Sequence, residues 1–365
     1  MPDQAVFFTG AGGFVGRHIL SYYLDRPDCN LYLLERGRFR ERLEAAVAAR
    51  VKDPDRRARI HIFDGDITQP NLGLDAKLAD EIQSTATRAM HLAAVYDLSV
   101  PKDVGYRINV DGTRNVLDFL GKAKRMERFG YMSTVAISGL FRGTFTEDDF
   151  DAGQAFKNHY EETKFLAEKA VRERRGTLPT VIFRPTIVVG DSQTGEFEKI
   201  DGPYFSLAAI SRNLHLIMPN FGEVLCNIEP IDFVAKAIYH LLEDPESTGQ
   251  VYQIADPDPV TYNRFLDLAC DQMHKIRPLI HVPPSFIAPF TRVKPISKLL
   301  GVNYDAFQYS CLPVRYGTSK SGPALAKHGI VCPPLPSYIQ VMIKYYMKHC
   351  RDARVRRGEI YKDVT

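Results

Sequence analysis

The segment Thr9–Gly16, with the sequence TGAGGFVG, constrains the fold more than any other part of the chain. It joins an apolar run at residues 5–8 to a helical pattern at residues 17–24. Glycines at positions 10, 13 and 16 permit a tight turn and let an anion approach the backbone. The next helix would then present free N–H groups and the positive end of its dipole. This order predicts a phosphate-binding turn, and the alternative is a tight turn that binds nothing.

Short apolar runs alternate with helical patterns along the first 255 residues. Such runs are typical of buried parallel strands, and alternation with helices implies right-handed βαβ units. We therefore predict an α/β fold with a doubly wound parallel Rossmann sheet of about seven strands. The expected strands are Ala5–Thr9, Asn30–Leu34, Arg59–Phe63, Arg88–Leu92, Phe129–Ser133, Thr180–Arg184 and Gln250–Ala255. The expected helices are Val15–Asp25, Arg40–Val51, Lys77–Ser84, Val104–Ala123, Tyr160–Arg174 and Ile231–Leu242.

Two stretches interrupt this alternation, residues 195–226 and the proline-rich residues 256–365. We expect both to fold over the carboxyl ends of the strands, where open α/β sheets bind ligands. This predicts a dinucleotide-binding domain of residues 1–194 and 227–255, and a smaller substrate-binding region of residues 195–226 and 256–365. Six apolar residues of the second region either line a substrate channel or belong to its core. They are Phe286, Ile287, Phe290, Ile296, Leu299 and Leu300.

Composition excludes several classes of protein. With 45% apolar and 25% charged residues, the 365-residue chain resembles a soluble globular protein. A net charge of +3 is too small to indicate a nucleic-acid partner. The six cysteines and ten histidines show no metal-ligand spacing, so we expect no metal site and reduced thiols in a cytoplasmic protein. No apolar stretch reaches the roughly 18 residues of a transmembrane segment, and no signal peptide is expected.

The end of the second expected strand indicates which dinucleotide the chain binds. An acidic residue there, Glu35, would accept hydrogen bonds from the adenosine ribose, whereas an arginine would pair with a 2′-phosphate. Arg36 follows directly, and Arg17 after the glycine turn adds a second guanidinium. This favours NADP(H) over NAD(H). The later arginines Arg40 and Arg42 are expected to form a solvated helix face.

Two further strand ends contribute to the same predicted site. Asp66, in the segment FDGDIT, can accept a hydrogen bond from an adenine amino group, or it can cap a turn. The small side chains of Ala93 and Ala94, after the fourth expected strand, would let a flat cofactor lie close. Both features place the cofactor at the carboxyl ends of the strands.

Candidate catalytic residues lie at the end of the fifth strand and in the helix that follows it. Tyr160 and Lys164 are four residues apart and share one helix face. A nearby ammonium favours the phenolate, so Lys164 is expected to lower the pKa of Tyr160 and to hold the nicotinamide ribose. Tyr160 can then exchange a proton with a carbonyl or hydroxyl group, while Thr134 hydrogen-bonds the same oxygen. The spacing alone would also suit an ordinary helix surface pair.

The order of the motifs TGxxGxxG, GDI, NVxGT, ST, YxxxK and RPT resembles that of the extended short-chain dehydrogenase/reductases, over about residues 4–255. The resemblance implies a catalytic triad of Thr134, Tyr160 and Lys164. Asn109 would support the site or join a helix to the sheet. The residues expected to contact the cofactor are Gly10, Gly13, Phe14, Val15, Gly16, Arg17, Glu35, Arg36, Asp66, Ile67, Ala93, Ala94, Tyr160, Lys164, Pro185, Thr186 and Ile187.

The chain most resembles the thioester-reductase and fatty-acyl-reductase branch of that family at residues 183–196, 202–204 and 226–238. This resemblance implies an NADPH-dependent reductase that transfers hydride to the carbonyl of a hydrophobic substrate. The substrate would be an acyl thioester, free or carrier-bound, or a long-chain aldehyde or ketone. The C-terminal region matches no acyl-reductase tail.

Two alternatives stay open at this point. The first is an NAD-dependent nucleotide-sugar epimerase or dehydratase, which Glu35 favours. The second is a non-catalytic dinucleotide-sensing protein, although such a protein would not need Thr134, Tyr160 and Lys164 together. The family resemblance also suggests a homodimer, in which the helices at residues 104–123 and 160–174 would form the interface.

Overall fold

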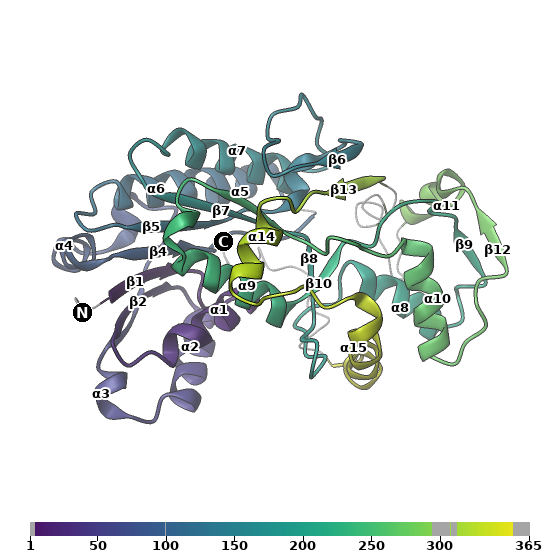
Figure 1. Cartoon of the computed structure of the whole chain (residues 1–365), viewed down its shortest axis with the longest axis horizontal. Coiled ribbons are helices and arrows are strands. Elements are labelled where there is room, and N and C mark those ends of the chain that lie inside the picture. Colours follow the sequence, from purple (N-terminus) through teal and green to yellow (C-terminus); the bar gives the residue numbers. More distant parts are fainter. Residues whose placement is uncertain (1–3, 99, 294–306, 308–311, 353–365) are drawn as a thin grey trace.

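A seven-stranded parallel sheet forms the centre of the computed structural model, which describes residues 4–98, 100–293, 307 and 312–352 (Figure 1). Its strands are β1 (Gln4–Thr9), β2 (Cys29–Glu35), β3 (Ile60–Asp64), β4 (Arg88–His91), β5 (Arg128–Met132), β7 (Thr180–Pro185) and β11 (Val251–Ile254). Their order is β11-β7-β5-β4-β1-β2-β3. The direction of winding changes between β1 and β4, which is where such sheets bind ligands. The predicted fold and its seven strands are confirmed.

Helices cover both faces of the sheet because successive residues of a buried strand point to opposite sides. Val6 and Phe8 of β1 pack with one set of helices, and Phe7 packs with the other. The first set is α1 (Phe14–Leu24), α2 (Arg38–Arg50) and α9 (Ile231–Glu243). The second is α4 (Ala76–Thr85), α6 (Gly112–Leu120) and α7 (His159–Glu173).

One helix differs from its prediction. The sequence predicts a single helix over residues 104–123, but the structure has α5 (Lys102–Gly105), a π-helical turn η2 (Tyr106–Asp111) and then α6. Asn109 in this turn bonds the Val95 amide at 2.8 Å and the Thr163 hydroxyl at 3.1 Å. Asn109 therefore joins the loop after β4 to helix α7. An apolar pattern does not distinguish a π turn from an α-helix, because both bury the same face.

The remaining segments form a second lobe, on the right of Figure 1. Its core lies among α8 (Pro203–Ser211), α10 (Tyr262–Gln272) and α15 (Leu335–His349). Three short parallel strand pairs accompany it: β8 (Ile187–Val189) with β10 (Ile228–Pro230), β9 (Ile217–Pro219) with β12 (Ile280–Val282), and β6 (Gly143–Phe145) with β13 (Val314–Tyr316). The domain boundaries stay a prediction. Helix α14 (Ser321–Lys327), which the prediction placed in the second region, packs against α9 and β11.

Several shorter elements complete the described part of the chain. They are α3 (Pro54–Arg57), η1 (Pro70–Gly73), η3 (Val135–Ser138), η4 (Pro245–Ser247) and α11 (Pro284–Thr291). No helix within the described residues is long and apolar enough to cross a membrane. The five cysteines among them are free thiols, and Cys311 lies outside the described residues.

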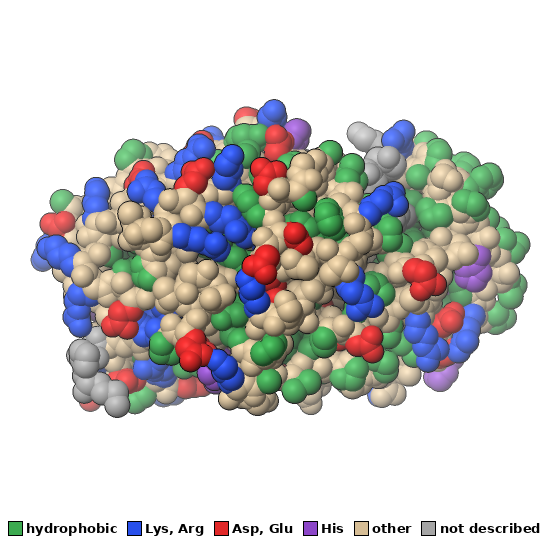
Figure 2. Space-filling view, turned by 45° about the horizontal axis from the view of Figure 1, so that its top comes forward, with side chains coloured by type: hydrophobic (Ala, Val, Ile, Leu, Met, Phe, Trp, Pro, Cys, Tyr) green, Lys and Arg blue, Asp and Glu red, His purple; other side chains and the backbone are tan. Residues whose placement is uncertain are grey.

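Apolar side chains gather at the far end of the second lobe, at the right of Figure 2. Those exposed in this region are Leu216, Ile217, Ile276, Leu279, Ile280, Phe286, Phe290 and Val293. Of the residues predicted to line a channel, Phe286 and Phe290 are therefore exposed, whereas Ile287 packs against the second-lobe core. Ile296, Leu299 and Leu300 lie outside the described residues.

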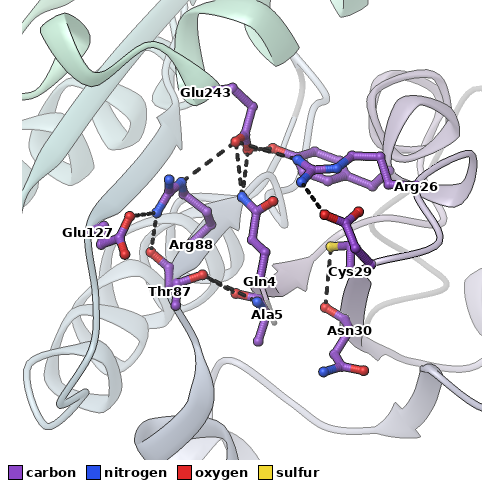
Figure 3. A network of polar contacts seen from close by, with 11 residues as sticks. Gln4, Ala5, Arg26, Cys29, Asn30, Thr87, Arg88, Glu127 and Glu243 are labelled. Atoms are coloured by element: carbon purple, nitrogen blue, oxygen red, sulfur yellow. Dashed lines mark hydrogen bonds and ion pairs between the residues drawn. The ribbon is translucent and has the colours of Figure 1, made fainter. Parts of the chain in front are cut away.

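A polar network fixes the C-terminal end of α9 to the sheet (Figure 3). The Glu243 carboxylate accepts hydrogen bonds from Gln4 Nε2 at 2.9 Å and from the Tyr23 hydroxyl at 2.7 Å. Its oxygens also lie 3.6 Å from Arg26 and 3.8 Å from Arg88. One carboxylate thus links helix α9 to strands β1 and β4 and to helix α1.

A buried ion pair stabilises the sheet behind the candidate site. Glu168 of α7 and Arg184 of β7 are both fully buried, with N–O distances down to 2.6 Å. Arg172 and the Ser133 hydroxyl also donate to Glu168. Burial by itself raises the pKa of Glu168, but these partners outweigh it, so the pKa lies below its usual value. Ser133 therefore anchors the end of β5, next to Thr134.

Candidate active site

The glycine turn lies between β1 and α1, as the sequence predicted. Gly10 has φ +78°, and a Cβ built on it would lie 2.5 Å from the Ala93 amide nitrogen. A Cβ on Gly16 would overlap the Gly10 carbonyl oxygen. Gly13 caps α1 without a side-chain hydrogen bond, so the first N–H groups of the helix have no capping side chain. The turn thus combines a close backbone approach with a positive helix end, a combination that suits a pyrophosphate.

A Gly16→Ala variant is expected to bind NADP(H) about 30-fold more weakly, because an overpacked contact costs roughly 2 kcal/mol and would open the turn. Isothermal titration calorimetry measures this affinity. Gly176→Ala is the matched control, since a Cβ on Gly176 meets no atom within 4 Å. Unchanged affinity in Gly16→Ala would show that the turn does not hold the cofactor.

The residues predicted for the adenosine end lie near one another, with specific partners. Glu35 is buried and its Oε1 accepts from the Gly12 N–H at 2.5 Å. Burial raises the pKa of Glu35 to about 7, although the Gly12 and Arg36 amides and the Arg17 charge oppose it. Arg36 extends outward and pairs with Asp66 at 2.8 Å. Arg17 donates to the Gly12 carbonyl at 2.7 Å. Glu35 thus braces the turn, and the guanidinium of Arg36 lies nearest to solvent.

One cavity of about 640 Å³ extends from the glycine turn into the second lobe. The predicted site residues that line it are Gly10, Gly13, Phe14, Val15, Gly16, Ala94, Thr134, Tyr160, Lys164, Pro185, Thr186 and Ile187. Its other end includes apolar and aromatic side chains, among them Phe205, Leu225, Tyr262, Leu312 and Val314. The predicted residues Arg17, Glu35, Arg36, Asp66, Ile67 and Ala93 lie outside this lining. The cavity therefore lies between the seven-stranded sheet and the second lobe.

Thr134 and Tyr160 meet in the middle of the cavity. Thr134 follows β5 and caps η3, where its Oγ1 accepts from the Ala136 amide at 3.1 Å. Tyr160 lies in the first turn of α7, whose Asn158 cap accepts from the Glu161 amide at 3.0 Å. The two side chains lie next to each other. Each is therefore held at the start of a helix, facing the same space.

Burial raises the pKa of Tyr160, and the neighbouring Thr134 hydroxyl only partly opposes this. The sequence had indicated a pKa lowered by Lys164. Lys164 Nζ instead donates to the Met132 carbonyl at 2.6 Å and to the Tyr131 hydroxyl at 3.1 Å. Burial also lowers the pKa of Lys164 to about 7. Tyr160 is thus protonated at neutral pH, as a proton donor must be.

Several cavity residues were missed by the sequence analysis. The Tyr96 ring packs edge-on against Tyr160, with centroids 5.1 Å apart, and Lys199 Nζ lies 5.0 Å from the Tyr96 centroid. Lys199 is also 3.7 Å from Asp201. Lys157 pairs with the buried Glu161. The only available signal was proximity, since Tyr96 closely follows Ala94 and Lys157 shortly precedes Tyr160. Loop residues carry no periodicity that would mark them.

Comparison with known proteins places this site in a family. The NAD-binding family described as "Male sterility protein" matches residues 8–238, which is more than half of the chain. The chain belongs to this family. The predicted resemblance to extended short-chain dehydrogenase/reductases of the thioester- and fatty-acyl-reductase branch is confirmed, and with it the class of nicotinamide-dependent oxidoreductase.

Individual relatives agree with this assignment. The chain is 28% identical over 274 residues to a linear gramicidin synthase of Brevibacillus parabrevis, covering 72% of this chain but 5% of that protein. It is 24% identical over 311 residues to fatty acyl-CoA reductase wat of Drosophila melanogaster, covering 73% of this chain and 60% of that one. The chain thus spans less than two thirds of either relative. The terminal R domain of the myxalamid PKS-NRPS pathway superimposes with a TM-score of 0.81 at 25% identity, covering 98% and 93% of the two chains.

Proposed function

We propose that the chain is an NADPH-dependent reductase that transfers hydride to the carbonyl carbon of a hydrophobic substrate. The substrate is an acyl thioester or a long-chain aldehyde or ketone. The continuous cavity carries this proposal, because it joins the glycine turn, the Thr134–Tyr160 pair and an apolar lobe. The name of the fatty acyl-CoA reductase relative supports a thioester. Presentation of the thioester on a carrier, formation of a homodimer and a cytoplasmic location stay predictions.

The residues of the site fit a nicotinamide dinucleotide. The glycine turn and the N-terminus of α1 would hold its pyrophosphate. Thr186 lines the cavity, and its buried hydroxyl has no hydrogen-bond partner among the described residues. This hydroxyl would bond the carboxamide of the nicotinamide. When bound, the reduced cofactor supplies the hydride.

The side chains of the site supply the proton and the orientation. Tyr160 donates its phenolic proton to the carbonyl oxygen as that oxygen becomes negative, and Thr134 hydrogen-bonds the same oxygen. With a thioester, addition of hydride and proton gives a hemithioacetal, whose C–S bond then breaks to release an aldehyde and a thiol. With an aldehyde or ketone, the same two additions give the alcohol directly. Lys164 holds positive charge beside the developing phenolate.

The direct test follows the absorbance of reduced nicotinamide with purified protein. The substrates are a long-chain acyl thioester, a long-chain aldehyde and a bulky ketone, each with NADPH and with NADH. NADPH consumption with the thioester would support the acyl-reductase reaction, and consumption only with the aldehyde or ketone would move the function to carbonyl reduction. No turnover, together with NAD retained through purification, would favour the epimerase alternative.

Cofactor preference gives a separate prediction. An Arg36→Leu variant is expected to bind NADPH about tenfold more weakly and NADH about equally well, because a charge-assisted bond to the 2′-phosphate is lost. Calorimetric titration with each dinucleotide measures this. Arg50→Leu is the matched control: Arg50 also forms an exposed ion pair, with Asp25, and its side chain is 48% exposed against 45% for Arg36. Equal losses for both dinucleotides in Arg36→Leu would contradict 2′-phosphate recognition.

A further inference from the structure

A row of buried, mostly hydrogen-bonded polar side chains extends from β1 to Lys164. Thr9 Oγ1 lies 2.6 Å from His91 Nδ1, and His91 Nε2 lies 3.1 Å from Thr113 Oγ1. The Thr113 side chain lies next to the Tyr131 hydroxyl. Tyr131 in turn accepts from Lys164 Nζ at 3.1 Å. All five side chains are buried, and they come from β1, β4, α6, β5 and α7.

The proton positions along this row follow from its contacts. The Thr113 hydroxyl donates to the Asn109 carbonyl at 2.6 Å, so its oxygen accepts from His91 Nε2. His91 therefore carries its proton on Nε2, and its Nδ1 accepts from Thr9. Burial, reinforced by the charge of Lys164, lowers the pKa of His91 to about 3, which keeps the ring neutral. An ammonium group can only donate, so the Tyr131 oxygen accepts from Lys164 through one of its lone pairs.

We propose that Tyr131 is a positioning residue, whose hydroxyl, with Thr113 beside it, accepts from the Lys164 ammonium and holds it in place on the face of α7 that lines the cavity with Tyr160. This inference rests on the proposed function for its consequence, but the hydrogen bond itself does not depend on that function. Lys164 Nζ also lies 4.7 Å from the Tyr131 ring centroid, so both the ring and the hydroxyl favour the charged amine. The remaining contact of Nζ is the Met132 carbonyl.

The ionisable groups around Lys164 bring its pKa close to neutral pH, so the hydrogen bond to Tyr131 affects whether Lys164 is charged there. Burial is the largest influence and lowers the pKa of Lys164 to about 7, while Glu168 on the same helix raises it. His91 on β4 is neutral, and Tyr160 and Tyr131 are protonated, because burial raises the pKa of both. A hydrogen bond accepted from the ammonium raises its pKa, so removing that bond lowers it. Lys164 would then lose its charge at a lower pH.

The test uses the full chain with Tyr131→Phe, which removes one oxygen atom. Competitive acetylation, read by mass spectrometry at a series of pH values, reports the pKa of Lys164 without any turnover. We expect this pKa to be about one pH unit lower than in the wild type. The alkaline limb of the kcat/KM profile should move down by a similar amount, with about a tenfold loss at pH 7.5 and a small loss at pH 5.5.

Tyr23→Phe is the matched control, because Tyr23 is equally buried and its hydroxyl donates to Glu243 at 2.7 Å, outside the cavity lining. Thr113→Val should lower the pKa of Lys164 in the same direction as Tyr131→Phe, whereas Thr113→Ser should leave it unchanged. These two variants keep the test informative if Tyr131→Phe does not fold.

An unchanged Lys164 titration in both Tyr131→Phe and Thr113→Val would overturn the inference. A uniform loss of activity at every pH would also overturn it, because a merely structural role predicts that result. Absence of reductase activity in the wild type would instead reject the proposed function, while the acetylation result would still stand.

Discussion

Tyr160→Phe is expected to lower kcat by about 10³-fold while leaving NADPH affinity nearly unchanged. Loss of a general acid typically costs 10²- to 10⁴-fold, and we propose the buried phenol of Tyr160, beside Thr134, as the proton donor. Phenylalanine keeps the ring and its edge-on contact with Tyr96, so the shape of the cavity is preserved. The measurement is steady-state turnover on the best substrate of the panel, together with calorimetric titration of NADPH.

The control for this variant is Tyr23→Phe. Tyr23 is fully buried in α1 and donates to Glu243 at 2.7 Å, outside the cavity lining. Loss of the Tyr23 hydroxyl should affect the stability of the fold rather than kcat. Turnover of Tyr160→Phe within threefold of the wild type would exclude Tyr160 as the proton donor. A variant that also failed to bind NADPH would indicate that the phenol acts in binding.

Arg184→Met is expected to lower the free energy of unfolding by about 3 kcal/mol at pH 7. The substitution leaves the Glu168 carboxylate buried with its main partner removed, and an uncompensated buried charge is strongly destabilising. The chain contains no tryptophan, so urea unfolding is best followed by circular dichroism.

The pH dependence of this loss identifies its cause. In the wild type the folded-state pKa of Glu168 lies below its usual value, so the carboxylate contributes stability above the unfolded pKa. Without Arg184, burial would raise that pKa, and the ionised form would become unfavourable in the folded state. The loss should therefore be large at pH 7 and should shrink as the pH falls through the folded-state pKa of wild-type Glu168, below its usual range, because the carboxyl then becomes protonated in the folded wild type as well.

The double variant Glu168→Leu/Arg184→Met provides the control, because it removes both charges. It should be more stable at pH 7 than Arg184→Met alone, as expected when a buried charge that has lost its main partner is replaced by apolar volume. A loss in Arg184→Met that did not vary with pH would attribute the effect to packing instead.

Much of the seven-stranded sheet and of the cavity lining beside it was predictable, because the sequence patterns that indicate them are local. The seven strands are continuous apolar runs, and the positions of Gly10, Gly13 and Gly16 specify a turn that larger residues would obstruct. The four-residue spacing of Tyr160 and Lys164 placed both on one helix face that lines the cavity. Each of these features depends on residues close together in the chain.

Other features depend on distant parts of the chain, and only the tertiary structure decided them. The second lobe includes three-residue strands such as β9 and β12, which pair across about 60 residues and carry almost no pattern of their own. The π turn at Asn109 follows from bonds to Val95 and Thr163. Burial also decides three features of the site: the inward orientation of Glu35, the contact of Lys164 with Tyr131 and the raised pKa of Tyr160. Burial is a property of the assembled fold, because the neighbours that exclude water from a side chain come from every part of the sequence.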